Sequence, residues 1–357
     1  IIHKLQKKFP SAVIVLTQSF VGLRSKKMKK TLYIFTEGEL KRKDNTLCYE
    51  TEAGRRFIPV ENINEIMVFG EVNFNKSLLE FVSQKEILIH YFNYYGYYMG
   101  TFYPREHLNS GYMILKQAEF YLNNVERINL ARSIVYGAYR NIRQVLKYYQ
   151  NRGRELTETI ETIEEMANSI SDCKDINQLM AVEGHIREQY YQAFDEITRN
   201  KDFLFQARSR RPPQNNMNVL ISLGNSILYT QVLSEIYKTH LDPRIGFLHA
   251  TNFRRFTLNL DVAEIFKPII IDRLIFSVID KKMITKGDFE KRTGGLLLKD
   301  KGKKVFVQEL DNKLQTTIKH KKIGRPVSYR RLIRLELYKL EKHLMGEEEY
   351  EPFVATW

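Results

Sequence analysis

Residues 109–125, with the sequence NSGYMILKQAEFYLNNV, divide this chain into two kinds of sequence. Residues 109–111 are typical of a turn, and the apolar residues that follow recur every three or four positions. This spacing predicts helical structure from Tyr112 to Gln150. The residues that show this spacing in its first turns are Leu115, Ala118, Tyr121, Leu122 and Val125.

Upstream of this point the sequence is typical of short β-strands. Aromatic and β-branched residues dominate four stretches, which are separated by turn residues: 31–36, 56–60, 65–69 and 87–92. One short helix is expected at 75–85. The pattern predicts a small β-sandwich-like domain over residues 28–108. Residues 1–27 precede Met28 and are interpreted as an upstream extension or a segment added for expression.

Downstream of this point the sequence is predominantly helical. Proline is absent from residues 106–211, so long helices are permitted there. Helices are expected at about 156–170, 176–200, 215–239 and 258–283, with short helices over 285–345. The fold class is therefore predicted to be α+β: a small N-terminal β-sandwich-like domain, then a larger all-α domain over 109–345 and a C-terminal tail at 346–357.

The composition limits the possible partners and compartments. The chain has 56 Lys and Arg against 42 Asp and Glu, a net charge of +14, which favours a polyanion such as nucleic acid over an uncharged partner. Its two cysteines, Cys48 and Cys173, cannot form a disulfide framework or a cysteine-rich zinc site. A reducing cytoplasm is expected. No apolar run approaches the roughly 18 uninterrupted residues that span a bilayer, so no membrane association is predicted.

Glu183 interrupts an apolar helix face. Asp175 is a suitable N-cap, and Leu179, Ile186 and Tyr190 follow on one side of the predicted helix, with Glu183 at its centre. A carboxylate buried without a partner is unstable by several kcal/mol, about the cost of desolvating one ion. Glu183 is therefore expected to meet a cation. Taken alone, an ion pair with Arg or Lys is the favoured interpretation, and a metal is the alternative.

Two further acids and a histidine follow in the sequence. Asp261 and Glu264 are three residues apart, so both project from one helix face, among apolar neighbours. Two such carboxylates repel each other unless they share a cation. His249 lies just upstream, and Gly246 would let the backbone approach closely there. One imidazole with carboxylates suits Mg²⁺ or Mn²⁺, which phosphodiester chemistry requires, although a core histidine and a solvated acidic patch are the simpler alternatives.

Four blocks, in this order, resemble the CRISPR-associated adaptation endonucleases, the integrases of spacer acquisition. The resemblance extends from about Met28 to Leu344 and includes the order of the domains. The blocks are EGHIR at 183–187 with Tyr191 and Phe194, RRPP at 210–213 with residues 218–224, LDPRIGFLH at 241–249, and LDVAEIFKP at 260–268.

This resemblance implies a site and a reaction. Mg²⁺ or Mn²⁺ would be held by Glu183, His249 and Glu264, and Asp261 would be an additional catalytic residue, either beside these ligands or as an alternate ligand. The family forms a homodimer through its β domain and binds a small second adaptation protein. Together they join the 3′-hydroxyl ends of a short protospacer duplex to the CRISPR repeat. The helical domain would therefore be catalytic and the β domain would dimerise.

Basic residues near these blocks are expected to follow DNA phosphates, with a contribution that is independent of base sequence. They are Arg187, Arg208, Arg210, Arg211, Lys238, Arg244, Arg254, Arg255 and Lys267. Two alternatives to the integrase remain open. One is a metal-dependent nuclease that acts on branched DNA in repair, and the other is a DNA-binding scaffold without catalysis.

Overall fold

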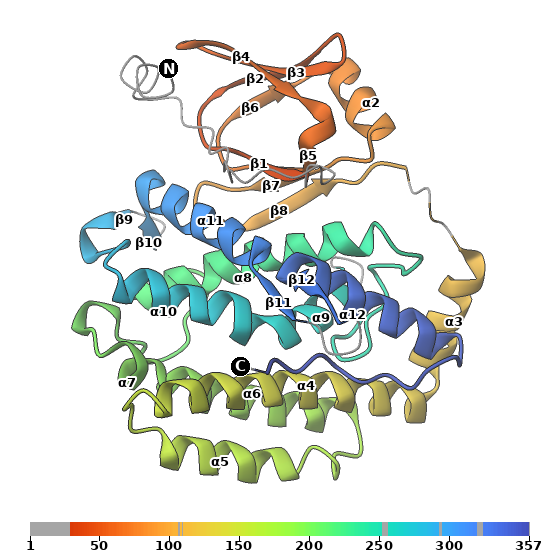
Figure 1. The fold of residues 1–357 in the computed structure, drawn as a ribbon, viewed down its shortest axis with the longest axis vertical. Helices are drawn as coiled ribbons and strands as arrows, with labels where there is room; N and C mark the ends of the chain where they lie inside the picture. Colours follow the sequence, from red (N-terminus) through yellow and green to blue (C-terminus); the bar gives the residue numbers. More distant parts are fainter. Residues whose placement is uncertain are drawn as a thin grey trace. The chain divides into compact units, whose positions relative to one another are not determined.

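The computed structural model describes residues 29–105, 108, 110–251, 256–292, 295–319 and 324–356. The chain divides into two units, Ile1–His107 and Leu108–Trp357. Strands form most of the first unit and helices most of the second (Figure 1), which confirms the predicted α+β class. The predictions for residues 1–27, Arg254 and Arg255 lie outside the described residues.

Two four-stranded sheets form the first unit. One has the order β1-β5-β7-β8 and is parallel except for its last pair, and the other has the order β4-β3-β2-β6 and is antiparallel except for β2 and β6. The strands are β1 Lys30–Ile34, β2 Gly38–Lys43, β3 Thr46–Thr51, β4 Gly54–Pro59, β5 Ile63–Val68, β6 Val72–Phe74, β7 Leu88–Phe92 and β8 Tyr98–Phe102.

One core joins these two sheets. Helix α2 (Lys76–Gln84) begins where the Asn75 side chain accepts a hydrogen bond from the Leu78 N–H, as in a normal N-cap. Residues from both sheets and from α2 pack in the same cluster, among them Leu32, Leu47 and Phe81. Because side chains alternate along a strand, one face of each sheet supplies this cluster, as in a sandwich.

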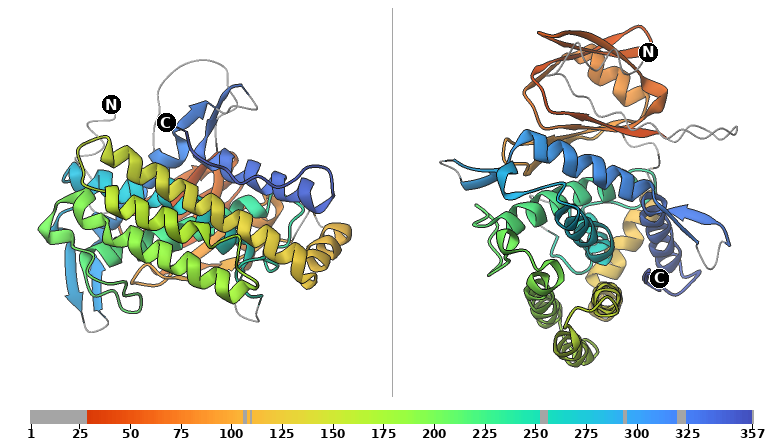
Figure 2. Two further views of the ribbon diagram at one scale, coloured as in Figure 1. Left: turned by 90° about the horizontal axis from the view of Figure 1, so that it is seen from below. Right: turned by 60° about the vertical axis from the view of Figure 1, so that its left-hand side comes forward.

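The second unit contains the long helices, seen from two further directions in Figure 2. They are α3 Gly111–Leu122, α4 Asn124–Gln150, α5 Thr157–Asn168, α6 Ile176–Gln192, α7 Phe194–Thr198, α8 Asn216–Ile236, α9 Leu258–Lys267, α10 Arg273–Asp280, α11 Asp300–Gln315 and α12 Tyr329–Leu344. A π-helical turn at Pro268–Asp272 connects α9 to α10 and begins at the proline.

Residues 285–345 differ from the short helices that were predicted. They form two 16-residue helices, α11 and α12, and two hairpins. The hairpins pair β9 (Phe289–Arg292) with β10 (Gly295–Leu298), and β11 (Thr317–Lys319) with β12 (Pro326–Ser328). These strands have three or four residues each, too few for a period of two to be recognised in the sequence.

Helix α9 lies at the centre of this unit, against α4 and α8, while α6 packs against α4 and α5. Helix α8 is long and apolar enough to cross a membrane by length and composition, which was not predicted because polar residues such as Asn225 and Gln231 are interspersed in it. Within the unit, 78% of the most apolar 18-residue stretch of α8 is buried, and the buried residues lie on every side of the helix. A helix of this kind is typical of a protein core.

The predicted helix over 112–150 is interrupted at Asn123. Its side chain accepts hydrogen bonds from the Val125 and Glu126 N–H groups and starts α4, so that α3 is a separate helix. The residues whose spacing indicated the helix do not all face the core, since Leu115 and Leu122 are 71% and 77% exposed. Helix α3 instead buries Met113 and Gln117.

The C-terminal residues are anchored to the helices. The Asn141 amide on α4 donates to the Phe353 carbonyl at 2.8 Å, and its oxygen accepts from the Ala355 N–H at 2.8 Å. Glu336 on α12 accepts from the Tyr350 hydroxyl at 2.6 Å. The Phe353 ring stacks on Phe266 of α9. Part of the predicted tail at 346–357 therefore packs on the helices, and Phe353 contacts the helix that carries two of the candidate acids.

Candidate active site

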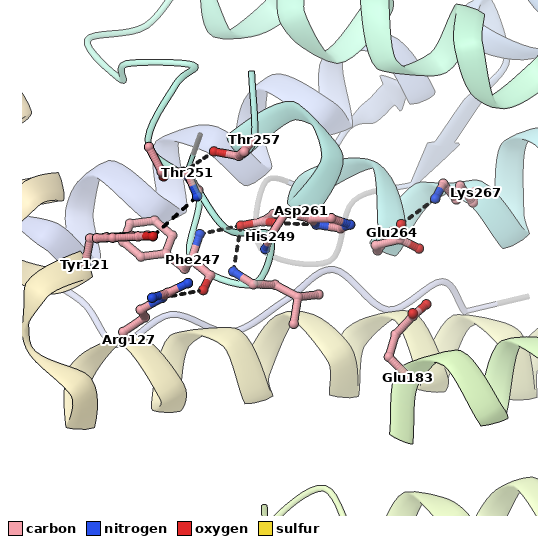
Figure 3. A network of polar contacts seen from close by, with 12 residues as sticks. Tyr121, Arg127, Glu183, Phe247, His249, Thr251, Thr257, Asp261, Glu264 and Lys267 are labelled. Atoms are coloured by element: carbon pink, nitrogen blue, oxygen red, sulfur yellow. Dashed lines mark hydrogen bonds and ion pairs between the residues drawn. The ribbon is translucent and has the colours of Figure 1, made fainter. Parts of the chain in front are cut away.

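Asp261 organises the loop that carries His249. Its carboxylate accepts hydrogen bonds from the backbone N–H groups of Phe247, Leu248 and His249, and Oδ1 lies 2.8 Å from His249 Nδ1 (Figure 3). Asp261 is fully buried. These contacts use most of the acceptor sites of one carboxylate. Asp261 thus positions His249 and the backbone around it.

Gly246 allows this loop to pass close to α9. A Cβ atom at that position would lie 2.8 Å from Asp261 Oδ2 and 2.8 Å from the Thr257 backbone. The Gly246 N–H donates to the Thr257 hydroxyl at 2.9 Å. The close approach that the sequence suggested for Gly246 is therefore confirmed.

Glu183 and Glu264 converge on one arginine. Arg187, one turn beyond Glu183 on α6, donates from Nη2 to Glu183 Oε1 at 3.1 Å and from the same nitrogen to Glu264 Oε2. Lys267, one turn beyond Glu264 on α9, donates to Glu264 Oε1. Figure 3 shows Glu183 pointing from α6 towards the side of α9 that carries Glu264. The ion pair considered for Glu183 is thus present, with an arginine of its own helix.

The charges of this cluster shift the pKa values of Glu264 and His249. Burial acts to raise the pKa of Glu264, but the charges of Lys267, Arg187 and His249 outweigh it and leave that pKa well below its ordinary value. Burial acts to lower the pKa of His249, but the Asp261 hydrogen bond and the charges of Asp261 and Glu264 outweigh it and raise that pKa. Glu264 is therefore ionised at neutral pH.

The two neighbouring acids of α9 have separate partners. Asp261 faces backbone N–H groups and His249, and Glu264 faces Arg187 and Lys267. Among the residues that the structure describes, no three His, Cys, Asp or Glu side chains are grouped to hold one metal ion. Arg187 and Lys267 supply the positive charge that the buried carboxylates require.

The chemistry of the donors nevertheless fits a divalent cation. Glu183 and Glu264 bring oxygens to one point, where a single Arg187 nitrogen now meets both. His249 contacts Asp261 through Nδ1, which directs Nε2 away from that carboxylate. Metal-binding histidines commonly use this arrangement, in which the second ring nitrogen is held by a carboxylate. Two carboxylates and one imidazole suit Mg²⁺ or Mn²⁺.

The basic residues predicted to follow phosphates lie in different surroundings. Arg187 and Lys267 are buried in the carboxylate cluster. Lys238 pairs with Glu235, Arg244 pairs with Asp242, and Arg208 donates to Asn218 and Ser222. Arg210 and Arg211 are exposed. Contact with DNA stays a prediction for all of them.

Asp272 is a buried acid beside this cluster that was not predicted from the sequence. Burial raises its pKa to about 7, although the charges of Arg187 and Lys267 act to lower it. It ends the run Pro268-Ile-Ile-Ile-Asp272, and an acid at the end of an apolar run was the signal that could have identified it. The sequence also did not indicate that Arg187 and Lys267 are internal partners of the acids.

Comparison with known proteins identifies the family. The sequence model described as CRISPR associated protein Cas1 matches residues 32–312. The chain belongs to the Cas1 family. This confirms the resemblance drawn from the four sequence blocks, and the match includes Glu183, His249, Asp261 and Glu264.

Individual Cas1 proteins match almost the whole chain. A relative from Thermodesulfovibrio yellowstonii, named CRISPR-associated endonuclease Cas1 2, is 63% identical over 330 residues, which are 92% of this chain and 100% of the relative. The solved structure of a Cas1 protein from Thermotoga maritima has a TM-score of 0.83 at 49% identity, over 90% of this chain and 99% of that one. The chain is therefore a Cas1 endonuclease of the CRISPR system, which confirms the predicted enzyme class over the scaffold alternative.

Two more distant solved structures share the fold. One is a casposase bound to integration product, with a TM-score of 0.81 at 20% identity, over 91% of this chain and 93% of that one. The other is a Cas6-RT-Cas1–Cas2 complex, with a TM-score of 0.82 at 18% identity, over 96% of this chain and 38% of that one. At these identities the likeness concerns the fold alone.

Proposed function

We propose that this Cas1 protein is a metal-dependent integrase that joins the 3′-hydroxyl ends of short DNA fragments to the CRISPR repeat by strand transfer. One observation carries the proposal: carboxylates from two helices, Glu183 on α6 and Glu264 on α9, meet at one cationic nitrogen. Glu264 is buried and Glu183 is partly buried, and carboxylates that converge away from solvent favour a cation between them. The same site would hydrolyse DNA when water replaces the attacking hydroxyl.

Glu183, His249 and Glu264 are the residues that would hold Mg²⁺ or Mn²⁺. Such an ion, when bound, offsets phosphate charge and stabilises the attacking and leaving oxygens of an in-line displacement. Asp261 keeps the His249 ring oriented through Nδ1 and the loop through three N–H groups. Arg187 and Lys267 hold the carboxylates ready in the absence of the ion.

The partners belong to the same proposal. The net charge of +14 supports DNA as the substrate. The Cas6-RT-Cas1–Cas2 complex, which shares this fold, supports a Cas2 partner, and the casposase bound to integration product supports DNA integration. A homodimer through the β-strand unit follows from the family resemblance. The basic residues Arg208, Arg210 and Arg211 remain candidates for phosphate contacts.

Strand transfer into a supercoiled repeat plasmid tests the proposal. Purified protein, Cas2, Mn²⁺ and a duplex with free 3′-hydroxyl ends should give joined product. Glu183→Ala and His249→Ala should each abolish joining while duplex binding, measured by anisotropy, stays within about twofold, because phosphate contacts outside the site dominate affinity. Wild-type joining by either variant would refute the site. Cleavage of branched DNA that needs no Cas2, with no joining, would favour a repair nuclease.

A further inference from the structure

A separate cavity lies in the helical unit, away from the candidate active site. Its volume is about 590 Å³, which is within the range of small-molecule sites. The end of α4, the end of α7, and the facing parts of α10 and α11 supply its walls. None of Glu183, His249, Asp261 or Glu264 lines it. Helices α10 and α11 can be followed in Figure 1.

The walls of this cavity are strongly basic. Two acids, Asp280 and Glu309, face five cationic side chains, which leaves a surplus of three positive charges. The cations are Arg152, Arg154, Arg273, Lys281 and Lys313. Like charges gathered around a concave surface raise the local concentration of anions. The cavity therefore attracts an anion and repels a cation.

Lys313 is a partly buried member of this group of cations. Burial, together with the charge of Arg273, lowers its pKa to about 8. Its ammonium group lies 4.8 Å from the centre of the Tyr329 ring. Within the described parts of the chain no carboxylate forms an ion pair with it. A lysine in this position is unfavourable for the free protein and gains most from an anionic ligand.

Two guanidinium groups stand over one tyrosine ring at the same cavity. Arg152 lies 4.4 Å and Arg273 lies 4.5 Å from the centre of the Tyr148 ring. Stacking on an aromatic ring limits the rotamers of an arginine, so less entropy is lost when it binds. Arginine presents paired donors that match the oxygens of a phosphate group. The cavity thus combines oriented arginines with a partly buried lysine that lacks a carboxylate partner among the described residues.

We propose that this cavity is a phosphate-binding site for a nucleotide or a DNA strand, with Arg152, Arg273 and Lys313 as the phosphate ligands. The site is additional to the candidate active site and does not depend on a metal. Its volume admits a nucleoside monophosphate. A free nucleotide and a DNA backbone present the same phosphate chemistry, and competition between them distinguishes the two sources.

Binding to the full chain without metal tests this assignment. The probes are inorganic phosphate and thymidine 5′-monophosphate by calorimetry and a short fluorescent oligothymidylate by anisotropy. Lys313→Met and Arg152→Gln should each weaken binding by about tenfold, and each should reduce the slope of log affinity against log salt by roughly 0.7, the value for one phosphate contact on a single strand. Lys313→Arg keeps the charge and should retain binding.

Lys301→Met is the matched control for Lys313→Met. Lys301 is an exposed residue of α11, the helix that carries Lys313, and it does not line the cavity. It should change affinity by less than about twofold. Arg152 is also exposed, so Arg152→Gln keeps the test valid if Lys313→Met fails to fold. Binding of the oligonucleotide alone assigns the site to a strand, and competition by the monophosphate assigns it to a nucleotide.

Two outcomes would overturn the assignment. One is equal affinity in Lys313→Met, Arg152→Gln and Lys301→Met, and the other is no binding of any probe. Glu183→Gln separates this test from that of the active site. It should retain cavity binding even where strand transfer is lost, since Glu183 does not line the cavity.

Discussion

Asp261 holds His249 at two points, because its Oδ1 accepts from the His249 backbone N–H at 2.9 Å and lies 2.8 Å from Nδ1 of the same residue. The backbone contact fixes the position of the His249 main chain. The side-chain contact engages Nδ1, so that Nε2 is left for other partners. Asp261 is thereby a positioning residue, and the loop, the ring and α9 form one connected element. These donors satisfy the acceptor oxygens of a carboxylate that is fully buried.

Replacement of Asp261 by Asn should therefore impair both the fold and the site. Asparagine offers one acceptor oxygen and turns an NH₂ group towards N–H donors. We expect the free energy of unfolding to fall by about 1–3 kcal/mol. Mn²⁺ affinity and cleavage should each fall by about 10- to 100-fold, as for other partners of metal-binding histidines. Urea denaturation, calorimetric Mn²⁺ titration and a cleavage assay measure these effects.

Asp175→Asn is the control for this substitution. Asp175 caps α6 by accepting from the Gln178 N–H at 2.9 Å, and Asn caps helices about as well as Asp. Stability and activity should stay near wild type in that variant. If Asp261→Asn behaved like Asp175→Asn, Asp261 would not position His249.

Arg187 should compete with the metal. It donates to Glu183 and Glu264 from one nitrogen, so Arg187→Gln leaves two carboxylates without that cation. Breaking a buried ion pair in this way costs about 3–5 kcal/mol, so the metal-free variant should have a lower Tm. Mn²⁺ would then restore the missing charge. The rise in Tm on adding Mn²⁺ should be larger in Arg187→Gln than in the wild type, measured by calorimetry.

Arg199→Gln is the comparison for this prediction, because Arg199 pairs with Glu196 at the exposed end of α7. An exposed pair contributes at most about 1 kcal/mol, so the Mn²⁺-induced rise in Tm should match that of the wild type. An equal rise in Arg187→Gln and Arg199→Gln would contradict a shared cation position.

Local signals explain what could be predicted from the sequence. The change at residues 109–111, the cap at Asp175 and the central place of Glu183 in an apolar face each depend on a few neighbouring residues, so pattern alone identified them. Asp261 and Glu264 were identified as a pair on one helix face, with His249 just upstream in the sequence. The three backbone contacts that separate the role of Asp261 from that of Glu264 depend on how a loop folds over α9.

Contacts between distant segments explain what could not be predicted from the sequence. Leu115 and Leu122 have helical spacing but are exposed, since spacing does not specify which side of a helix meets the core. The partners of Glu264 come from α6 and from α9 itself, and pairing across helices is not visible in one sequence. The C-terminal segment was predicted as a tail, and the bonds between its backbone and Asn141 join residues more than 200 positions apart.

Asn141 should be important for the stability of the helical unit. Its amide group donates to the Ile265 and Phe353 carbonyls and accepts from the Ala355 N–H, so it joins α4 to α9 and to the C-terminal segment. Asn141→Ala leaves these three backbone groups without their partner. The free energy of unfolding should fall by about 2–4 kcal/mol. Asn151→Ala, at the exposed end of the same helix, should change it by less than about 0.5 kcal/mol, and equal effects would contradict this role.

Asp272 should make stability depend on pH. Its pKa is about 7 in the folded protein, against an ordinary value of 3.8. Below the ordinary value both states hold the proton, so the residue has no effect there. Between the two values the unfolded chain releases the proton and the folded protein keeps it, so the free energy of unfolding falls as pH rises, by up to about 1.4 kcal/mol per pH unit. Above the folded pKa both states are ionised and the loss is constant.

Asp272→Asn removes this effect because the amide does not ionise. The difference in free energy of unfolding between the variant and the wild type should therefore increase in favour of the variant from pH 5 to pH 7 and then level off. Urea denaturation at several pH values measures it. Asp172→Asn, at an exposed turn, corrects for the loss of one carboxylate from the net charge. A difference for Asp272→Asn that stayed constant from pH 5 to pH 8 would mean that Asp272 is already ionised in the folded protein, held so by Arg187 and Lys267.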